Sequence, residues 1–175
     1  DIDAVRADIL EEIDNPVKKV RDKSKLTLVS GLWNISREGR DFDEHYVPRF
    51  KEFLKIDQPM ILFVPSYLED IVWEVRDKDN TTVKNYELED IKHMYGPFWD
   101  QTQKIRKDPK WLNQTGVNGW LPNSPQASLE YYNPIVQTKM FLLSDASIWN
   151  PYDTDYFFWL DAGITNTVPV GHLVD

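Results

Sequence analysis

The run PMILFVP, at residues 59–65, places five consecutive apolar side chains between two prolines and most constrains how this chain can fold. Proline cannot occupy the interior of a central strand, so the two prolines mark the ends of the run. A short apolar run without polar alternation is typical of a strand that is buried on both faces. Helices cover both faces of such strands in parallel sheets, so the run predicts an α/β architecture.

Other stretches along the chain extend this prediction. Further strands are predicted at residues 25–33, 81–88 and 156–160. Helical spacing of apolar residues predicts helices at residues 1–22, 43–56, 66–77, 88–108 and 128–149. The alternation of strands and helices predicts a Rossmann-like three-layer sandwich around a mainly parallel sheet.

Local signals refine the predicted elements. Ser66 and Glu69 have the spacing of a capping box at a helix start, and a Gly-Pro pair at 96–97 interrupts the helix that follows the third strand. Residues 108–125 are rich in Pro, Gly and Asn and are expected to form an ordered surface loop. Trp111 and Trp120 lie in this loop, where they could stack on a sugar ring, although packing is the commoner role of Trp.

The final predicted strand ends on a carboxylate, in the sequence YFFWLDAGITN. Ligands of α/β sheets bind beyond the carboxyl ends of the strands, where Asp161 would lie. Ala162 and Gly163 leave room for a ligand, and Asn166 adds an amide. One carboxylate with small neighbours suits a divalent cation that bridges to phosphate oxygens. The alternative is that Asp161 only caps a turn.

Three cationic side chains are predicted to lie near the same edge of the sheet. Arg37 and Arg40 occupy the loop after the first strand, and Lys139 lies in an apolar segment of the helix before the last strand. Both places can converge on one pocket at the carboxyl edge, where the cations would bind an anion. The alternative is that they are solvated surface charges.

Composition and missing motifs exclude several functional classes. A net charge of −9 and a pI of about 4.8 argue against a nucleic-acid partner. The chain has no Cys, so disulfides and Cys-based metal sites are excluded, and a reducing cytoplasm fits. We expect no membrane span, because no apolar run approaches the required length. The motifs HExxH, GxSxG, GxGxxG and the P-loop are all missing.

The length of 175 residues predicts a single domain over residues 1–175. The chain begins with Asp rather than Met and ends shortly after the strand-end carboxylate. We therefore expect it to be part of a longer protein, with the acceptor side of the domain incomplete.

Several segments carry a resemblance to a known family. LVSGLWNISR, HYVPRFKEFLKIDQPMILFVP and WLDAGI resemble, in the same order, the WlaTC/HtrL (HtrL/YibB) group of bacterial glycosyltransferases. YFFWLDAG is similar to the strand and Asp-x-Asp region of GT-A-fold enzymes that use nucleotide sugars. Asp161 matches the strand-end aspartate, whereas Gly163 stands where the second Asp of that motif usually lies.

The resemblance implies a GT-A-like enzyme of polysaccharide biosynthesis that transfers a sugar from a nucleotide-sugar donor to a glycan, a lipid-linked acceptor or another hydroxyl. Asp161 would bind Mn²⁺ or Mg²⁺, and the residues implied at the nucleotide sugar are Arg37, Arg40, Lys139, Gly163 and Asn166. A cytoplasmic location, including the inner face of the membrane, would follow. The catalytic base is not identified. The missing second Asp favours an alternative, a carbohydrate-binding or scaffold domain that keeps the fold without the chemistry.

Overall fold

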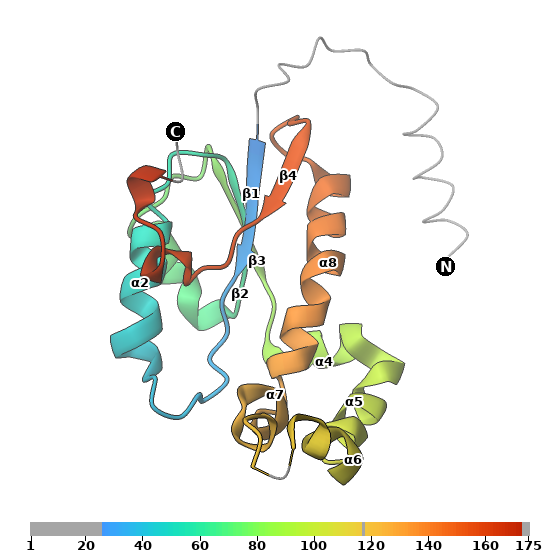
Figure 1. Ribbon diagram of the computed structural model, residues 1–175. Coiled ribbons are helices and arrows are strands. Elements are labelled where there is room, and N and C mark those ends of the chain that lie inside the picture. The colour runs from blue at the N-terminus through green and yellow to red at the C-terminus, as the bar shows by residue number, and fades with distance from the viewer. Residues whose placement is uncertain (1–25, 117, 173–175) are drawn as a thin grey trace, which may run out of the picture.

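The computed structural model describes residues 26–116 and 118–172 (Figure 1). Within these residues, four parallel strands form one sheet in the order β3-β2-β1-β4. The strands are β1 (Leu26–Gly31), β2 (Met60–Val64), β3 (Thr81–Asn85) and β4 (Tyr156–Trp159). The predicted α/β fold with a parallel sheet is confirmed, and the helix expected over residues 1–22 lies outside the described residues.

Helices occupy the crossovers that parallel strands require. They are α2 (Val47–Phe53), α3 (Glu69–Trp73), α4 (Leu88–Tyr95), α5 (Trp99–Ile105), α6 (Pro109–Leu112), α7 (Pro125–Ser128) and α8 (Tyr132–Trp149). The segment from α4 to α8 connects β3, at one edge, to β4, which pairs with β1. The carboxyl ends of β1 and β4 are therefore neighbours, and the loops that follow them meet.

Two hydrophobic cores lie on opposite faces of the sheet, which gives the expected three layers (Figure 1). The strand β2 supplies both, because its side chains alternate between the faces. Leu62 packs with Phe50 of α2 on one face. Ile61 packs with Leu142 of α8 on the other. All five residues of β2 are fully buried, as the proline-bracketed run predicts.

The strand β4 is less buried than β2. Phe157 and Trp159 are partly buried and pack against the core beneath α8, but Tyr156 and Phe158 are 55% and 57% exposed. β4 lies at an edge of the described sheet, and within the described residues α2 and α3 pack over β1 and β2 instead. An aromatic run shows that a strand is apolar, but it does not show how many of its faces are covered.

The predicted capping box at Ser66 is wrong. Residues Ser66–Leu68 form a 3₁₀ turn before α3, and both the backbone N–H and the hydroxyl of Ser66 donate to the carboxylate of Glu87. The capping box belongs to α4, where Glu87 accepts from the backbone of Asp90 and the Asp90 side chain accepts from Glu87 N–H at 2.7 Å. Ser66 therefore bonds to Glu87, far along the chain, and not to Glu69 as the sequence pattern predicted.

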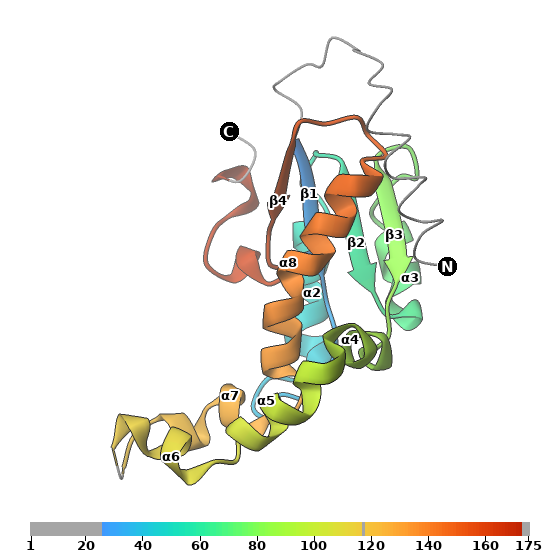
Figure 2. The same cartoon turned by 90° about the vertical axis from the view of Figure 1, so that its right-hand side faces the viewer.

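The region between the third strand and α8 is more broken than predicted. The Gly-Pro interruption is confirmed, since Gly96 has φ of 47° between α4 and the turn that leads into α5. The expected loop at 108–125 contains α6 and two 3₁₀ turns. The helix expected over residues 128–149 begins only at Tyr132, after α7. Figure 2 shows α5, α6 and α7 extending away from the sheet.

Candidate functional site

A cavity of about 360 Å³ lies where the loops after β1 and β4 meet the first half of α8. Its lining residues come from three segments of the chain. They are Gly31 to Ile35 with Arg37, Arg40, Phe42 and Tyr46 after β1; Tyr132, Ile135, Val136 and Lys139 on α8; and Trp159, Asp161 to Ile164 and Thr167 at the end of β4. This is the position that the strand-end rule predicts for a ligand site.

The end of β1 is shaped by a glycine. A Cβ atom at Gly31 would lie 2.5 Å from the indole ring of Trp33 and 2.8 Å from the carbonyl oxygen of Phe63. The missing side chain lets Trp33 fold back over the strand, where its indole N–H donates to the carbonyl oxygen of Tyr86 at 2.8 Å. Trp33 thereby fixes the start of the loop that carries Arg37 and Arg40.

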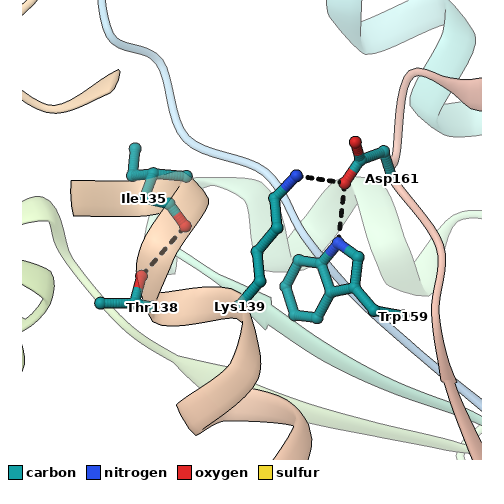
Figure 3. Close-up of polar contacts among 5 residues, drawn as sticks. All are labelled: Ile135, Thr138, Lys139, Trp159 and Asp161. Atoms are coloured by element: carbon teal, nitrogen blue, oxygen red, sulfur yellow. Dashed lines mark hydrogen bonds and ion pairs between the residues drawn. The ribbon is translucent and has the colours of Figure 1, made fainter. Parts of the chain in front are cut away.

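Asp161 is held by two donors in the cavity (Figure 3). The ammonium of Lys139 and the indole N–H of Trp159 both donate to Oδ1 of Asp161, at 2.6 Å and 2.7 Å. Lys139 also lies 5.8 Å from the centre of the Trp159 ring, within cation–π range. The predicted strand-end carboxylate and the predicted helix cation are therefore direct partners.

The surroundings of Asp161 keep it ionised. Partial burial acts to raise the pKa of its carboxyl, but the hydrogen bonds from Lys139 and Trp159 and the charge of Lys139 outweigh burial, so the pKa lies below its ordinary value. The side chain of Lys139 is 25% exposed and that of Asp161 is 59% exposed. Both residues line the cavity, and Lys139 is the more enclosed of the two.

The loop after β1 brings two arginines to the same cavity. Arg37 is half-buried and donates to the hydroxyl of Tyr46 at 3.4 Å, while Arg40 is exposed and its backbone N–H donates to the carbonyl of Arg37. Their charges reach neighbouring groups. The pKa of His45 is lowered by partial burial and then by the positive charges of Arg49, Arg40 and Arg37. Among the described residues, neither Arg37 nor Arg40 forms an ion pair.

Gly163 and Asn166 have different positions. Gly163 lines the cavity, has an ordinary φ of −92°, and a Cβ atom built on it would meet nothing within 4 Å. Its missing side chain therefore leaves open space that a ligand can use. Asn166 does not line the cavity, because the turn Ile164–Asn166 carries it toward α2, where its Oδ1 accepts from Arg49 Nε at 3.0 Å.

The residues present do not fit a divalent cation held by the protein. Asp161 is the one carboxylate among the lining residues, and its Oδ1 already accepts from Lys139. Mg²⁺ and Mn²⁺ prefer several oxygen ligands, whereas this cavity offers one carboxylate beside three cationic side chains. Within residues 26–116 and 118–172, no group of three or more His, Cys, Asp or Glu side chains could hold a metal.

Sequence reasoning missed the hydrogen bond from Trp159 to Asp161. Residues two apart on a strand point to the same face, so Trp159 and Asp161 were candidates for contact from their spacing alone. Trp111 and Trp120, expected as sugar contacts, do not line the cavity, although Trp120 is 64% exposed.

No helix in the described part of the chain is both long and apolar enough to cross a membrane.

Comparisons with known proteins give a family but no activity. Neither the curated proteins nor the solved structures gave a match to this chain. The family model HtrL_YibB, described as a bacterial protein of unknown function, matches residues 24–170, and the chain therefore belongs to this family.

Proposed function

We propose that this chain is a GT-A-like glycosyltransferase domain that uses a nucleotide-sugar donor. One observation carries the proposal: Arg37 and Arg40, from the loop after β1, and Lys139, from α8, line one cavity together with Asp161. Cations gathered in a cleft favour an anionic ligand. Here three cations gather in one cavity although the whole chain has a net charge of −9. The cavity volume of about 360 Å³ is in the range of small-molecule sites, which is roughly 300–1,000 Å³.

The remaining lining suits the uncharged parts of such a donor. Trp33, Phe42 and Tyr46 add aromatic surface beside the arginines, and Ile135 and Val136 add aliphatic surface from α8. Ligand sites typically combine apolar walls with a few polar groups that fix orientation. A nucleobase and a sugar ring would use the apolar walls, and the diphosphate would use the cations.

The chemistry requires little from the protein beyond placement and charge. The bond from the anomeric carbon to the diphosphate oxygen breaks, and the nucleoside diphosphate leaves with the electron pair. The acceptor oxygen bonds to the carbon, and the proton of the acceptor hydroxyl passes to the departing diphosphate or to water. Cationic donors that face the leaving group stabilise its growing negative charge. The acceptor hydroxyl must lie in line with the breaking bond. Asp161 accepts hydrogen bonds from Lys139 and Trp159, and its pKa is lowered, so we assign it to positioning Lys139 rather than to accepting a proton.

The acceptor class and location follow from the proposed reaction. A glycan or a lipid-linked hydroxyl would receive the sugar, as in polysaccharide biosynthesis, and a cytoplasmic site of action would give access to nucleotide sugars. These assignments depend on the family resemblance rather than on contacts in the cavity.

A ligand screen tests the proposal. We expect UDP, GDP, CDP or ADP to raise the melting temperature, and the matching nucleotide sugar to be hydrolysed slowly when no acceptor is present. Lys139→Met should reduce both effects. Lys51→Met is a matched control, because Lys51 forms an ion pair with Glu74 at 2.5 Å and does not line the cavity. If no nucleoside diphosphate binds and no nucleotide sugar is hydrolysed, the proposal fails.

A second candidate function is a carbohydrate-binding or scaffold domain without catalysis. The presence of Gly163 in place of a second carboxylate favours this candidate, because the cavity then lacks a second carboxylate ligand for a metal. This candidate predicts glycan binding that is independent of nucleotide. A glycan array with and without a nucleoside diphosphate and EDTA separates the two functions.

A further inference from the structure

We infer that the cavity binds the diphosphate of its donor without a metal, with Lys139 released from Asp161 to the phosphate oxygens when the ligand enters. The inference rests on the proposed function for the identity of the ligand. It assigns the neutralising charge to side chains of this chain and gives Asp161 a role other than metal ligand.

The charge balance of the cavity is the first support. Three cationic side chains and one carboxylate line it, so the lining carries more positive than negative charge. The carboxylate is already neutralised by Lys139 at 2.6 Å. Arg37 and Arg40 form no ion pair within the described residues, and their charge remains available to an anion. The excess of two positive charges in the lining equals the two negative charges of the diphosphate group in a nucleotide sugar.

The hydrogen-bonding capacity of the three cations is the second support. A lysine ammonium has three N–H donors, and Lys139 spends one on Asp161. Each guanidinium has five donors, and the side chain of Arg37 spends one on Tyr46. One arginine guanidinium can also donate two parallel hydrogen bonds to phosphate oxygens. The remaining donors are enough for every non-bridging oxygen of a diphosphate to accept at least one hydrogen bond.

The arrangement around Lys139 is the third support. A lysine side chain loses much conformational freedom when it binds a ligand, which weakens binding. Here the side chain is already ordered by the carboxylate of Asp161 and the ring of Trp159 (Figure 3). A phosphate oxygen can replace Asp161 as the partner of Lys139 without further ordering of the lysine side chain. Asp161 thus acts as a positioning residue that holds the lysine ready.

The same arrangement opposes a metal at Asp161. A divalent cation on this carboxylate would lie close to the ammonium of Lys139, which would repel it. A metal site would need Lys139 to move away and further oxygen ligands to arrive. Within the described residues, the lining provides no second carboxylate for that purpose.

The test is calorimetric titration of the nucleoside diphosphates and of inorganic pyrophosphate, in EDTA and in Mn²⁺. We expect dissociation constants that agree within about threefold between the two conditions, since no metal takes part in binding. Lys139→Met should weaken binding in EDTA by roughly tenfold or more, the effect of losing a charged hydrogen bond. Lys51→Met should change nothing, and melting curves confirm that each variant is folded.

The variant Asp161→Asn distinguishes a role of Asp161 in positioning Lys139 from a role as a metal ligand. The amide oxygen can still accept from both Lys139 and Trp159, so the lysine stays in position while the competing charge is removed. We therefore expect affinity in EDTA that is equal to or higher than that of the wild type. A metal ligand would show the opposite result, because Asn lacks the charge that holds a divalent cation. Binding that requires Mn²⁺ and is lost in Asp161→Asn overturns the inference and leaves the proposed function standing.

The pyrophosphate arm distinguishes failure of the inference from failure of the proposed function. If pyrophosphate binds in EDTA and depends on Lys139 while every nucleoside diphosphate fails to bind, the cavity is a metal-free anion site and the glycosyltransferase proposal is wrong. If neither pyrophosphate nor any nucleoside diphosphate binds in either condition, the inference is overturned as well.

Discussion

Lys139 in α8 donates a hydrogen bond of 2.6 Å to Asp161, which follows β4. The pair forms because α8 runs antiparallel to β4, so that the first half of the helix lies beside the carboxyl end of the strand (Figure 1). The same edge of the sheet receives the loop after β1, which carries Arg37 and Arg40. One geometric rule therefore brings all four charged residues together.

The lowered pKa of Asp161 gives a prediction about stability and pH. Its folded pKa lies below the unfolded value of 3.8, so ionised Asp161 stabilises the fold above 3.8 and loses this contribution as pH falls through the folded pKa. Asp161 is largely exposed, so the contribution is small, about 0.5–1 kcal/mol. Asp161→Asn should be less stable than the wild type by that amount near neutral pH, and the difference should shrink at about pH 3.

Urea denaturation of both proteins at the two pH values measures this difference. Asp161→Asn in a Lys139→Met background is the control, because the double variant has no ion pair to lose. A stability difference that does not change with pH would show that Lys139 and Asp161 are not coupled in solution.

Gly31 gives a prediction about the end of β1. Gly31→Ala places a Cβ atom against the ring of Trp33 and the carbonyl of Phe63, and backbone cannot yield as a flexible side chain can. We expect a loss of about 1–3 kcal/mol in the free energy of unfolding, as for overpacked cores. A red shift of Trp fluorescence should accompany it as Trp33 is displaced. Unchanged stability would mean that the strand end adjusts without cost.

Gly163 gives the opposite prediction. Gly163→Ala meets no atom within 4 Å and has an ordinary backbone conformation, so its stability should equal that of the wild type or exceed it by about 0.4–1 kcal/mol. Ligand affinity should fall, because the methyl group enters the cavity. Gly163→Asp should weaken metal-free binding further, since it adds a negative charge beside the anion. Affinity that is equal in all three proteins would show that the ligand lies elsewhere.

Much of this architecture could be predicted from short apolar runs and from the strand-end rule. The run at 59–65 is buried on both faces, and five of the six predicted site residues line one cavity. Asn166 could not be placed, because a local 3₁₀ turn carries it away toward Arg49. The bond between Ser66 and Glu87 could not be predicted either, since it joins residues 21 apart in the sequence. Contacts of this kind are set by tertiary packing, which leaves no local pattern.

The two faces of β4 give a prediction about packing. Phe157 is partly buried and packs against the core beneath α8, so Phe157→Ala should cost about 2–3 kcal/mol, less than for a fully buried Phe. Phe158 points to the other face and is 57% exposed, so Phe158→Thr should change stability by about 0.5 kcal/mol or less. Parallel thermal denaturation of the two variants measures the contrast. Similar losses in both would mean that Phe158 is covered in solution.

Arg76 gives a prediction about the edge of the sheet opposite the cavity. Its guanidinium is buried and donates to the carbonyl oxygens of Leu54, Ile56 and Gln58, and its Nε donates to the hydroxyl of Thr81 at 2.8 Å. These bonds fasten the segment before β2 to the start of β3. Arg76→Met leaves several carbonyl acceptors without this donor and should cost about 2–4 kcal/mol, since a buried acceptor left unpaired costs about 1–3 kcal/mol.

Arg76→Lys should recover little of this loss, because a lysine ammonium cannot reproduce the planar set of donors. Chemical denaturation measures both variants against the wild type. Below their melting temperatures, both should bind nucleoside diphosphates as the wild type does, since Arg76 does not line the cavity. If Arg76→Lys restores full stability, charge rather than guanidinium geometry holds this edge together.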